Sequence, residues 1–363
     1  MTLSVTIAAG QLDISIHTSR RPLDELLTFA SRENPKRGFL FISKILGKHW
    51  PVAPSAMRAA YDELAQLIQA GTNSYVVGMA ETATGLGAGV ADSLSRLQNA
   101  AVFYQHTTRC QTDHPLWLSL DEAHSHAVDH LFYQPHPALL ADIQKSQRLI
   151  LVDDEITTGR TLQRLAERLL PKLPEVKEVV IVALVSWLDE QARQQLSQFP
   201  VPVRFVTLLE GQFSFTPNPT YQAHLPADVD HDLSHVKGRE DLGRFGLKMP
   251  YQGAVHPVAG DNPLTVIGDG EHLYLPFLIA EATEKQGRLV HFQSTTRSPI
   301  AHTDGISNKL SFAIDERPLR HYLYNFQHSS AGESLFVLED ENQRAQHGLP
   351  PLLTTQHNPQ TRS

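Results

Sequence analysis

The sequence predicts an α/β fold built on a parallel β-sheet, because strand and helix signals alternate along much of the chain. Short apolar runs indicate strands at Ser74–Gly78, Ala101–Gln105, Arg148–Val152, Glu178–Ser186 and Val203–Leu209. Apolar residues at helical spacing indicate helices at Arg58–Gln69, Leu86–Leu97 and Leu162–Leu170. In such sheets a ligand binds at the carboxyl ends of the strands, where the loops after Val77, Gln105 and Val152 should meet.

The strand that ends at Val152 is the best-defined element. Four apolar residues flanked by polar ones, Leu149–Val152, are typical of a strand that is buried on both faces of a parallel sheet. The helix after it is indicated by apolar residues on one helical face: Leu162, Leu165, Ala166 and Leu169. The loop between this strand and this helix therefore lies at the carboxyl edge of the sheet.

Composition limits the classes of function. The chain has 363 residues, 41% of them hydrophobic, which is enough for two domains with ordinary cores. Its net charge of -8 offers no basic field for nucleic acid or for an anionic membrane surface. The single cysteine, Cys110, excludes an intramolecular disulfide and indicates a reducing compartment. The N-terminal residues carry no signal-peptide pattern and no apolar stretch is long enough to span a bilayer, so we expect a cytoplasmic protein.

The loop after Val152 has the chemistry of a sugar-phosphate site. Asp153 and Asp154 directly follow the strand, and two adjacent carboxylates suit the vicinal hydroxyls of a ribose 5-phosphate or a Mg²⁺ shared with them. Backbone N–H groups at a helix start cradle a phosphate dianion, with threonine hydroxyls as extra donors and a glycine for close approach. The predicted phosphate contacts are Thr157, Thr158, Gly159, Arg160 and Thr161.

This run resembles the phosphoribosyl pyrophosphate (PRPP) motif of type I phosphoribosyltransferases, in which a hydrophobic strand precedes two acidic residues, two variable residues and Thr-Thr-Gly-x-Thr. The pair Thr157-Thr158 is closer to the orotate phosphoribosyltransferase version than to the hypoxanthine-guanine version, which usually has an Asp general base at the position of Thr157. Glu155 departs from both versions, and whether it points into the site or to solvent stays open. The resemblance implies a type I phosphoribosyltransferase-like parallel sheet with flanking helices and a hood, which binds PRPP and Mg²⁺ at Asp153 and Asp154.

Two further loops gain roles from this resemblance. Ala80, Glu81 and Thr82 belong to a small-residue loop whose counterpart in the family holds pyrophosphate on backbone amides. Glu81 is unusual there, because a carboxylate repels pyrophosphate unless Mg²⁺ or a basic side chain intervenes. Arg109, after the second strand, either reaches the diphosphate with its fork of donors or faces solvent.

The segment from Cys110 to Ala141 stands where the family has a flexible lid that excludes water. It contains His124, His126 and His130. On a helix His126 and His130 share a face that His124 does not, so a site with three histidines on one metal is disfavoured. One histidine as an acid/base group or phosphate contact of the lid is favoured.

The densest basic stretch, Arg32–Pro54, contains Lys44 and Lys48. It is either the hood that binds the acceptor base or a solvated loop.

The C-terminal part of the chain repeats the N-terminal part. Val266–Glu271 mirrors Val76–Glu81, Val290–Arg297 mirrors Val102–Arg109, and Leu335–Glu341 mirrors Leu149–Glu155. Three matched segments in one order predict a second, degenerate phosphoribosyltransferase-like α/β domain, which lacks a phosphate cradle because Asn342-Gln343-Arg344-Ala345 replaces Thr-Thr-Gly. We expect the strands near Val266, Val290 and Val337 to be neighbours in one parallel sheet. Glu271 and Arg297 would take the places of Glu81 and Arg109, either in a second pocket or as a structural ion pair.

Ser294-Thr295-Thr296-Arg297-Ser298-Pro299 also resembles the TRSP domain found behind a phosphoribosyltransferase domain in bacterial tellurite-resistance and stress-response gene clusters. For that family the resemblance implies a transferase that makes a nucleoside- or nucleotide-like metabolite. The expected domains are a transferase-like domain with its hood at 1–225, a linker or lid at 226–254, the TRSP domain at 255–345 and a frayed tail at 346–363.

The leading hypothesis is a Mg²⁺-dependent transfer of ribose 5-phosphate from PRPP to an unidentified small-molecule nucleophile. One alternative is a non-catalytic PRPP or nucleotide sensor, and a second is a PRPP synthetase-like enzyme, because that enzyme also pairs two such units. No nucleic acid or membrane partner is indicated, and a homodimer is left open.

Overall fold

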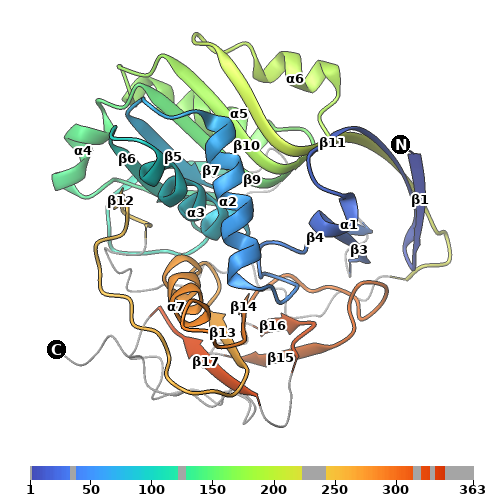
Figure 1. Ribbon diagram of the computed structural model, residues 1–363. Coiled ribbons are helices and arrows are strands. Elements are labelled where there is room, and N and C mark those ends of the chain that lie inside the picture. The colour runs from blue at the N-terminus through green and yellow to red at the C-terminus, as the bar shows by residue number, and fades with distance from the viewer. Residues whose placement is uncertain are drawn as a thin grey trace. The chain divides into compact units, whose positions relative to one another are not determined.

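The computed structural model describes residues 2–32, 38–121, 128–222, 243–313, 320–327 and 332–339 (Figure 1). The chain divides into two compact units, and each combines segments that are distant in sequence. One unit comprises Arg58–Glu210 and Asp232–Gly253. The other comprises Met1–Met57, Gly211–His231 and Ala254–Ser363. The units are therefore discontinuous, whereas the domains expected from the sequence are contiguous.

The unit that contains Arg58–Glu210 is built on a largely parallel sheet. Its elements are α2 (Pro54–Ile68), β5 (Ser74–Gly78), α3 (Ala83–Leu97), β6 (Val102–His106), β7 (Leu116–Asp121), β8 (Val128–Tyr133), α4 (Pro137–Ile143), β9 (Arg148–Ile156), α5 (Arg160–Leu169), β10 (Glu178–Ser186), α6 (Glu190–Leu196), β11 (Val203–Pro217) and β12 (Leu247–Met249). The strand order is β11-β10-β9-β5-β6-β12, and all neighbours are parallel except β12 on β6. The alternation of strands and helices predicted this architecture, which is confirmed.

The buried strands have the hydrophobic character that the sequence indicated. Every residue of β5 and β6 is buried, and so are the first five residues of β9. The buried face of α5 consists of Leu162, Leu165, Ala166 and Leu169, as predicted from their spacing. Helix α3 packs on β5, β6 and β9 and covers one face of the sheet (Figure 1).

The other unit contains several small sheets. Its elements are β1 (Thr2–Ile7), β2 (Gly10–Ser19), α1 (Leu23–Leu26), β3 (Leu27–Ser31), β4 (Phe39–Ser43), β13 (Leu264–Gly268), α7 (Tyr274–Glu284), β14 (Val290–Ser294), β15 (Lys309–Ala313), β16 (Arg320–Tyr324) and β17 (Glu333–Val337). β1 and β2 form an antiparallel hairpin, as do β3 with β4 and β15 with β16. In the sheet order, β2 and β1 follow β11, whose residues from Gly211 onward belong to this unit.

The predicted repeat is present. β13 lies between β14 and β17, parallel to both, just as β5 lies between β6 and β9. Gly268 aligns with Ser294 and Val337, as Gly78 aligns with His106 and Val152. The expected neighbours in one parallel sheet are therefore confirmed.

The predicted match between the third strands of the two repeats was wrong by one residue. Because Val337 takes the register position of Val152, Leu338 corresponds to Asp153 and Glu339 to Asp154. The sequence comparison had matched Glu339 with Asp153. The second copy thus has an apolar residue at the first acidic position. The cradle positions of this copy, 342–345, lie outside the described residues.

The two repeats exchange short segments. Gly243 accepts a hydrogen bond of 3.2 Å from His106 N at the end of β6, and β12 then runs antiparallel to β6. Gly47 accepts the equivalent bond of 2.7 Å from Ser294 N at the end of β14, and an antiparallel bridge joins Val52 to Phe292. The segment that precedes the second repeat therefore completes the first sheet, and the segment that precedes the first repeat completes the second sheet.

The exchanged segments share a sequence pattern that explains their placement. Gly243-Arg244-Phe245 and Gly47-Lys48-His49 begin with a glycine at φ +89° and +67°, respectively. A Cβ at either glycine would overlap the aromatic ring of the neighbouring strand, Tyr104 or Phe292. Only glycine combines this conformation with such a close approach. The following cations, Arg244 and Lys48, are each 1% exposed.

No helix among the described residues is long and apolar enough to cross a membrane.

Candidate active site at the strand ends

The acidic pair lies within the last residues of β9, not after the strand. Strand β9 continues through Ile156 because β10 pairs with it as far as Ser186. Asp153 and Asp154 are half-buried, and the N–H of Asp154 donates to Asp153 Oδ1 at 3.0 Å. Burial, followed by the charge of Asp154, raises the pKa of Asp153 well above its usual range. The pair thus favours a cation or hydrogen-bond donors beside it.

Glu155, whose direction was open, is half-buried. Strand alternation places it on the same face as Asp153. Its negative charge contributes to the raised pKa of Asp153. Three carboxylates therefore stand close together at this strand end.

The predicted phosphate loop leads directly into α5. Gly159 is the residue before the helix, with φ +67°, and a Cβ there would overlap Leu196. The N-cap residue of α5 is Gly159, which has no side chain and therefore gives the amide groups of the first turn no capping oxygen. Thr157 and Thr161 are half-buried, while Thr158 and Arg160 are exposed. This arrangement has the donors that an anion needs at a helix start.

The small-residue loop after β5 is tied to both neighbouring strands. Met79 N donates to Val152 O of β9 at 2.9 Å. Ala80 N donates to Thr107 Oγ1 at 2.8 Å, and Thr107 N donates to Gly78 O at 3.0 Å. Ala80, Glu81 and Thr82 therefore begin at a fixed position beside the acidic strand end. The Ala80–Glu81 peptide bond is cis.

His130 is linked to this loop through Thr107. It lies on strand β8, so the helical spacing considered for it was wrong, since β7 and β8 form an antiparallel hairpin. Its Nδ1 lies 3.0 Å from Thr107 Oγ1, whose hydroxyl already accepts from Ala80 and can donate its own proton to the imidazole. Burial, and then the charge of Arg109, lower the pKa of His130 to about 3. A buried, neutral imidazole fits a support for the loop better than an acid/base group of a lid. His124 and His126 lie outside the described residues.

Arg109 is exposed and close enough to His130 to influence its pKa. The residue before it, Thr108, is held by backbone bonds to Leu131 in both directions at 2.8 Å. Thr108 Oγ1 also accepts from Arg244 Nε at 3.2 Å. Arg109 thus directly follows a residue that is held by both backbone and side-chain hydrogen bonds.

Sequence reasoning missed Thr107 and Arg244. Thr107 could have been found, because Thr295 stands at its position in the second copy and makes the same contact: Gly270 N donates to Thr295 Oγ1 at 2.8 Å. Arg244 lies in the stretch 226–254, which was expected only to be a linker or lid. Only its likeness to Gly47-Lys48 could have marked it.

The two lysines of the predicted hood belong to the other unit. Lys44 Nζ donates to Asp24 O at 2.7 Å and lies 5.5 Å from the centre of the Trp50 ring. Lys48 Nζ donates to Gly270 O at 2.6 Å. Lys48 therefore contacts the loop that carries Glu271, and its amine is engaged inside the second copy.

The second copy contains a buried charged cluster in place of the acidic pair. Burial, followed by the charge of Glu339, raises the pKa of Asp269 to about 7, although Lys48 and Arg297 oppose the shift. Asp269 Oδ1 lies 3.4 Å from Thr295 Oγ1 and 3.8 Å from His321 Nδ1. Glu271 is buried and Arg297 half-buried. The loop geometry of the first copy is thus retained around different side chains.

Among the described residues, no three His, Cys, Asp or Glu side chains converge as a ready metal cage. Mg²⁺ does not require one, because it usually takes one or two carboxylates and completes its shell with water and substrate phosphates. Asp153 and Asp154 meet that requirement by their chemistry.

Residues 26–212 match the family model described as phosphoribosyl transferase, which covers more than half of the chain. The chain belongs to this phosphoribosyl transferase family. Residues 243–354 match the model of the TRSP domain that lies C-terminal to this transferase domain. The predicted family and its TRSP partner domain are therefore confirmed. No curated protein matches this chain.

Solved structures similar to this chain include three phosphoribosyltransferases. Adenine phosphoribosyl transferase from Trypanosoma brucei, in complex with AMP, pyrophosphate and ribose-5-phosphate, is 16% identical over 52% of this chain and 77% of its own, with a TM-score of 0.37. The Giardia lamblia enzyme with 9-deazaadenine is 19% identical over 53% and 98%, with a TM-score of 0.34. Orotate phosphoribosyltransferase from Aeropyrum pernix is 17% identical over 47% and 79%, with a TM-score of 0.29.

Proposed function

We propose that the protein transfers ribose 5-phosphate from PRPP to a small-molecule nucleophile, such as a nitrogen base, and releases pyrophosphate. The observation that carries this proposal is the arrangement of three loops on the adjacent parallel strands β6, β5 and β9. One loop presents two carboxylates and an uncapped helix start, and a second presents small residues tied to the first by the bond from Met79 N to Val152 O. The proposal includes a cytoplasmic location, since PRPP is a soluble metabolite.

Each loop would bind one part of PRPP. The amides and hydroxyls of residues 157–161 would hold the 5′-phosphate, because donors at an uncapped helix start favour a dianion. Asp153 and Asp154 would accept hydrogen bonds from the ribose hydroxyls. The loop Ala80–Thr82 and Arg109 would hold the pyrophosphate group.

Mg²⁺ fits this site by the chemistry of its donors. Asp153 and Asp154 offer the oxygen ligands that Mg²⁺ prefers, and a bound cation would offset the burial and the charge of Asp154 that disfavour the charged form of Asp153. When bound, Mg²⁺ would supply positive charge between the carboxylates and the diphosphate. It would also offset the repulsion expected from Glu81 and Glu155.

The catalytic contribution of the protein would be mainly electrostatic. In the reaction the bond from ribose C1 to pyrophosphate breaks and a bond from C1 to the acceptor forms, so positive charge develops on the sugar. Asp153 and Asp154 would stabilise that charge, while Arg109 would stabilise the charge that leaves with pyrophosphate. Thr107 and His130 would keep the Ala80 amide in place during this change.

The test is a titration of the full chain with PRPP and Mg²⁺, followed by assay of pyrophosphate release with a panel of purine, pyrimidine and other nitrogen bases. Binding followed by release with at least one base supports the transferase. Binding without turnover on any base would favour the sensor alternative. Formation of PRPP from ATP and ribose 5-phosphate would favour the synthetase alternative, and absence of PRPP binding would contradict the proposal.

A further inference from the structure

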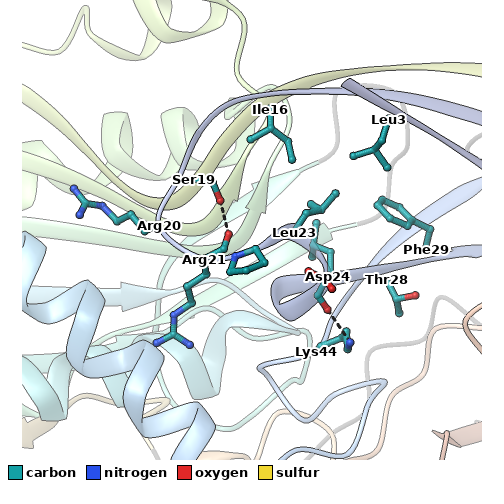
Figure 2. A pocket seen from close by; sticks show the side chains of 12 residues that line it. Leu3, Ile16, Ser19, Arg20, Arg21, Leu23, Asp24, Thr28, Phe29 and Lys44 are labelled. Carbon is teal, nitrogen blue, oxygen red and sulfur yellow. Dashed lines mark hydrogen bonds between the residues drawn. The ribbon is translucent and has the colours of Figure 1, made fainter. Parts of the chain in front are cut away.

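A cavity of about 830 Å³ lies in the unit that contains the N-terminal hairpin. It is lined by residues of β1, β2, α1 and β3, by the turn at Arg20–Pro22, and by Lys44 (Figure 2). All of these residues lie between Leu3 and Lys44, so a single short stretch of chain builds the whole wall. The volume is within the ordinary range of sites for small organic molecules.

One side of this cavity is apolar. Leu3, Ile16, Leu23 and Phe29 are only half-buried and line the cavity (Figure 2), and the buried residue Leu27 also belongs to the lining. Leaving such side chains in contact with water is unfavourable, and a ligand with an apolar body would remove that contact.

The other side is basic. The lining contains the cations Arg20, Arg21 and Lys44 and a single acidic residue, Asp24, although the chain as a whole has a net charge of -8. Figure 2 shows both arginines on the left, across from Leu3 and Phe29. Lys44 is anchored by its bond to Asp24 O, so its charge is fixed at the cavity. A carboxylate, sulfonate or phosphate group would bind well beside these cations.

We infer that this cavity binds a small organic anion with a flat or bulky apolar body, held by Leu3, Ile16 and Phe29 and by Arg20 and Arg21. The inference is independent of the proposed transfer reaction, because no lining residue belongs to the strand-end loops.

The test compares two probes that share an aromatic body, 1-naphthoate and 1-naphthalenemethanol, by calorimetric titration of the full chain. The naphthoate should bind about tenfold more tightly, the ratio for one favourable charge contact. Arg20→Gln with Arg21→Gln should reduce naphthoate binding to the level of the alcohol. The control Arg168→Gln with Lys177→Gln removes the same charge from exposed positions of the other unit. It should change the affinity for neither probe.

Equal binding of the two probes would overturn the inference, as would unchanged naphthoate binding in the Arg20/Arg21 variant. No binding of either probe at millimolar concentration would also overturn it. A second variant, Leu23→Asn, should weaken both probes alike, and melting temperatures show that each variant is folded.

A second inference concerns the exchanged segment at the start of the TRSP match. Arg244 is 1% exposed, and its Nε donates to Thr108 Oγ1 at 3.2 Å. Its carbonyl accepts from Gln105 Nε2 at 2.9 Å. The next residue, Phe245, packs on Tyr133 and stacks on His114 at 3.8 Å between ring centres. Arg244 and Phe245 therefore make hydrogen bonds and ring contacts with residues of β6 and β8 and of the segment that carries Arg109.

The geometry points to Arg244 as a positioning residue for the proposed pyrophosphate contacts. The Thr107 hydroxyl accepts a hydrogen bond from the Ala80 amide, and the Thr108 hydroxyl accepts one from Arg244. The two residues before Arg109 are therefore both fixed by side-chain hydrogen bonds. The inference rests on the proposed function. It also gives the TRSP region a role, because residues 243–250 complete the sheet of the transferase.

The test measures the Kd of PRPP with Mg²⁺ for Arg244→Met, Thr108→Val and the double variant. Each single change should weaken PRPP binding about tenfold, and the two losses should not add in the double variant, because both changes remove the Arg244–Thr108 bond, although Thr108→Val also removes the acceptor of Cys110 N. Thr108→Ser keeps the hydroxyl and should bind as the wild type. The control Arg148→Met removes another buried arginine, paired with Glu178 at the opposite end of β9, and should lower the melting temperature without changing the Kd.

Wild-type affinity in Arg244→Met and Thr108→Val would overturn the positioning role while leaving the transferase proposal intact. Additive losses in the double variant would also overturn it. Absence of PRPP binding by the wild type would instead refute the proposed function.

Discussion

The hydroxyl oxygen of Thr107 lies 2.8 Å from the backbone nitrogen of Ala80 and so fixes the loop after β5 to the end of β6. Thr295 makes the same bond to Gly270 at the same length in the second copy. The copies differ at the acidic positions yet keep this bond. A threonine at the end of the second strand is therefore part of how both copies hold the first loop.

Thr107→Val should destabilise the protein and weaken PRPP binding. The substitution leaves the Ala80 N–H without its acceptor in a partly buried site, which costs roughly 1–3 kcal/mol. Chemical denaturation and PRPP titration measure the two effects. Thr107→Ser should behave as the wild type, and Thr295→Val should lower stability by a similar amount with PRPP affinity unchanged. If Thr107→Val bound PRPP with the affinity of the wild type, the loop after β5 would not be part of the PRPP site.

Gly159→Ala should weaken PRPP binding by about 1–3 kcal/mol. A Cβ at this position overlaps the end of the Leu196 side chain, and φ +67° is unfavourable for alanine, so the substitution strains the loop. Gly71 also has a positive φ, +107°, but a Cβ there meets nothing within 4 Å. Gly71→Ala therefore reports the backbone cost alone. If both variants bind PRPP as the wild type does, the phosphate lies elsewhere.

Asp153→Asn with Asp154→Asn should abolish transfer and raise the melting temperature in the absence of Mg²⁺ and PRPP. Three carboxylates crowd this strand end, and burial together with Asp154 penalises the charge of Asp153. Removing the charges relieves that penalty and removes the groups that orient the ribose. The exposed control Glu175→Gln should alter neither property. A folded double variant with normal turnover would contradict the mechanism.

The sequence revealed the parts of the fold that depend on local pattern. β5 and β10 begin and end where the apolar runs do, and the buried face of α5 follows from residue spacing. The features it did not reveal depend on distant partners. β9 extends to Ile156 because β10 runs beside it, and His130 lies on a strand because β7 pairs with β8. The Gly-cation pattern that the Gly47 and Gly243 segments share does not specify which of the two sheets each segment completes.

The last prediction concerns pH and the second copy. The pKa of Asp269 is raised to about 7 from an ordinary value of 3.8, so between these values the folded state holds a proton that the unfolded state has lost. The stability that this proton contributes is fully present below about pH 4 and is lost as the pH rises toward 7, by at most about 4 kcal/mol. Asp269→Asn cannot titrate and should flatten this part of the pH profile. Denaturation of the wild type and of this variant at several pH values measures the difference between their slopes.

His130 contributes to the pH dependence of stability in the opposite direction. Its pKa is lowered to about 3, so its stabilisation is lost as the pH falls below 6.5. It is present in both proteins and cancels in the comparison. Parallel pH profiles would show that Asp269 titrates normally and that its burial beside Glu339 is balanced by Lys48 and Arg297.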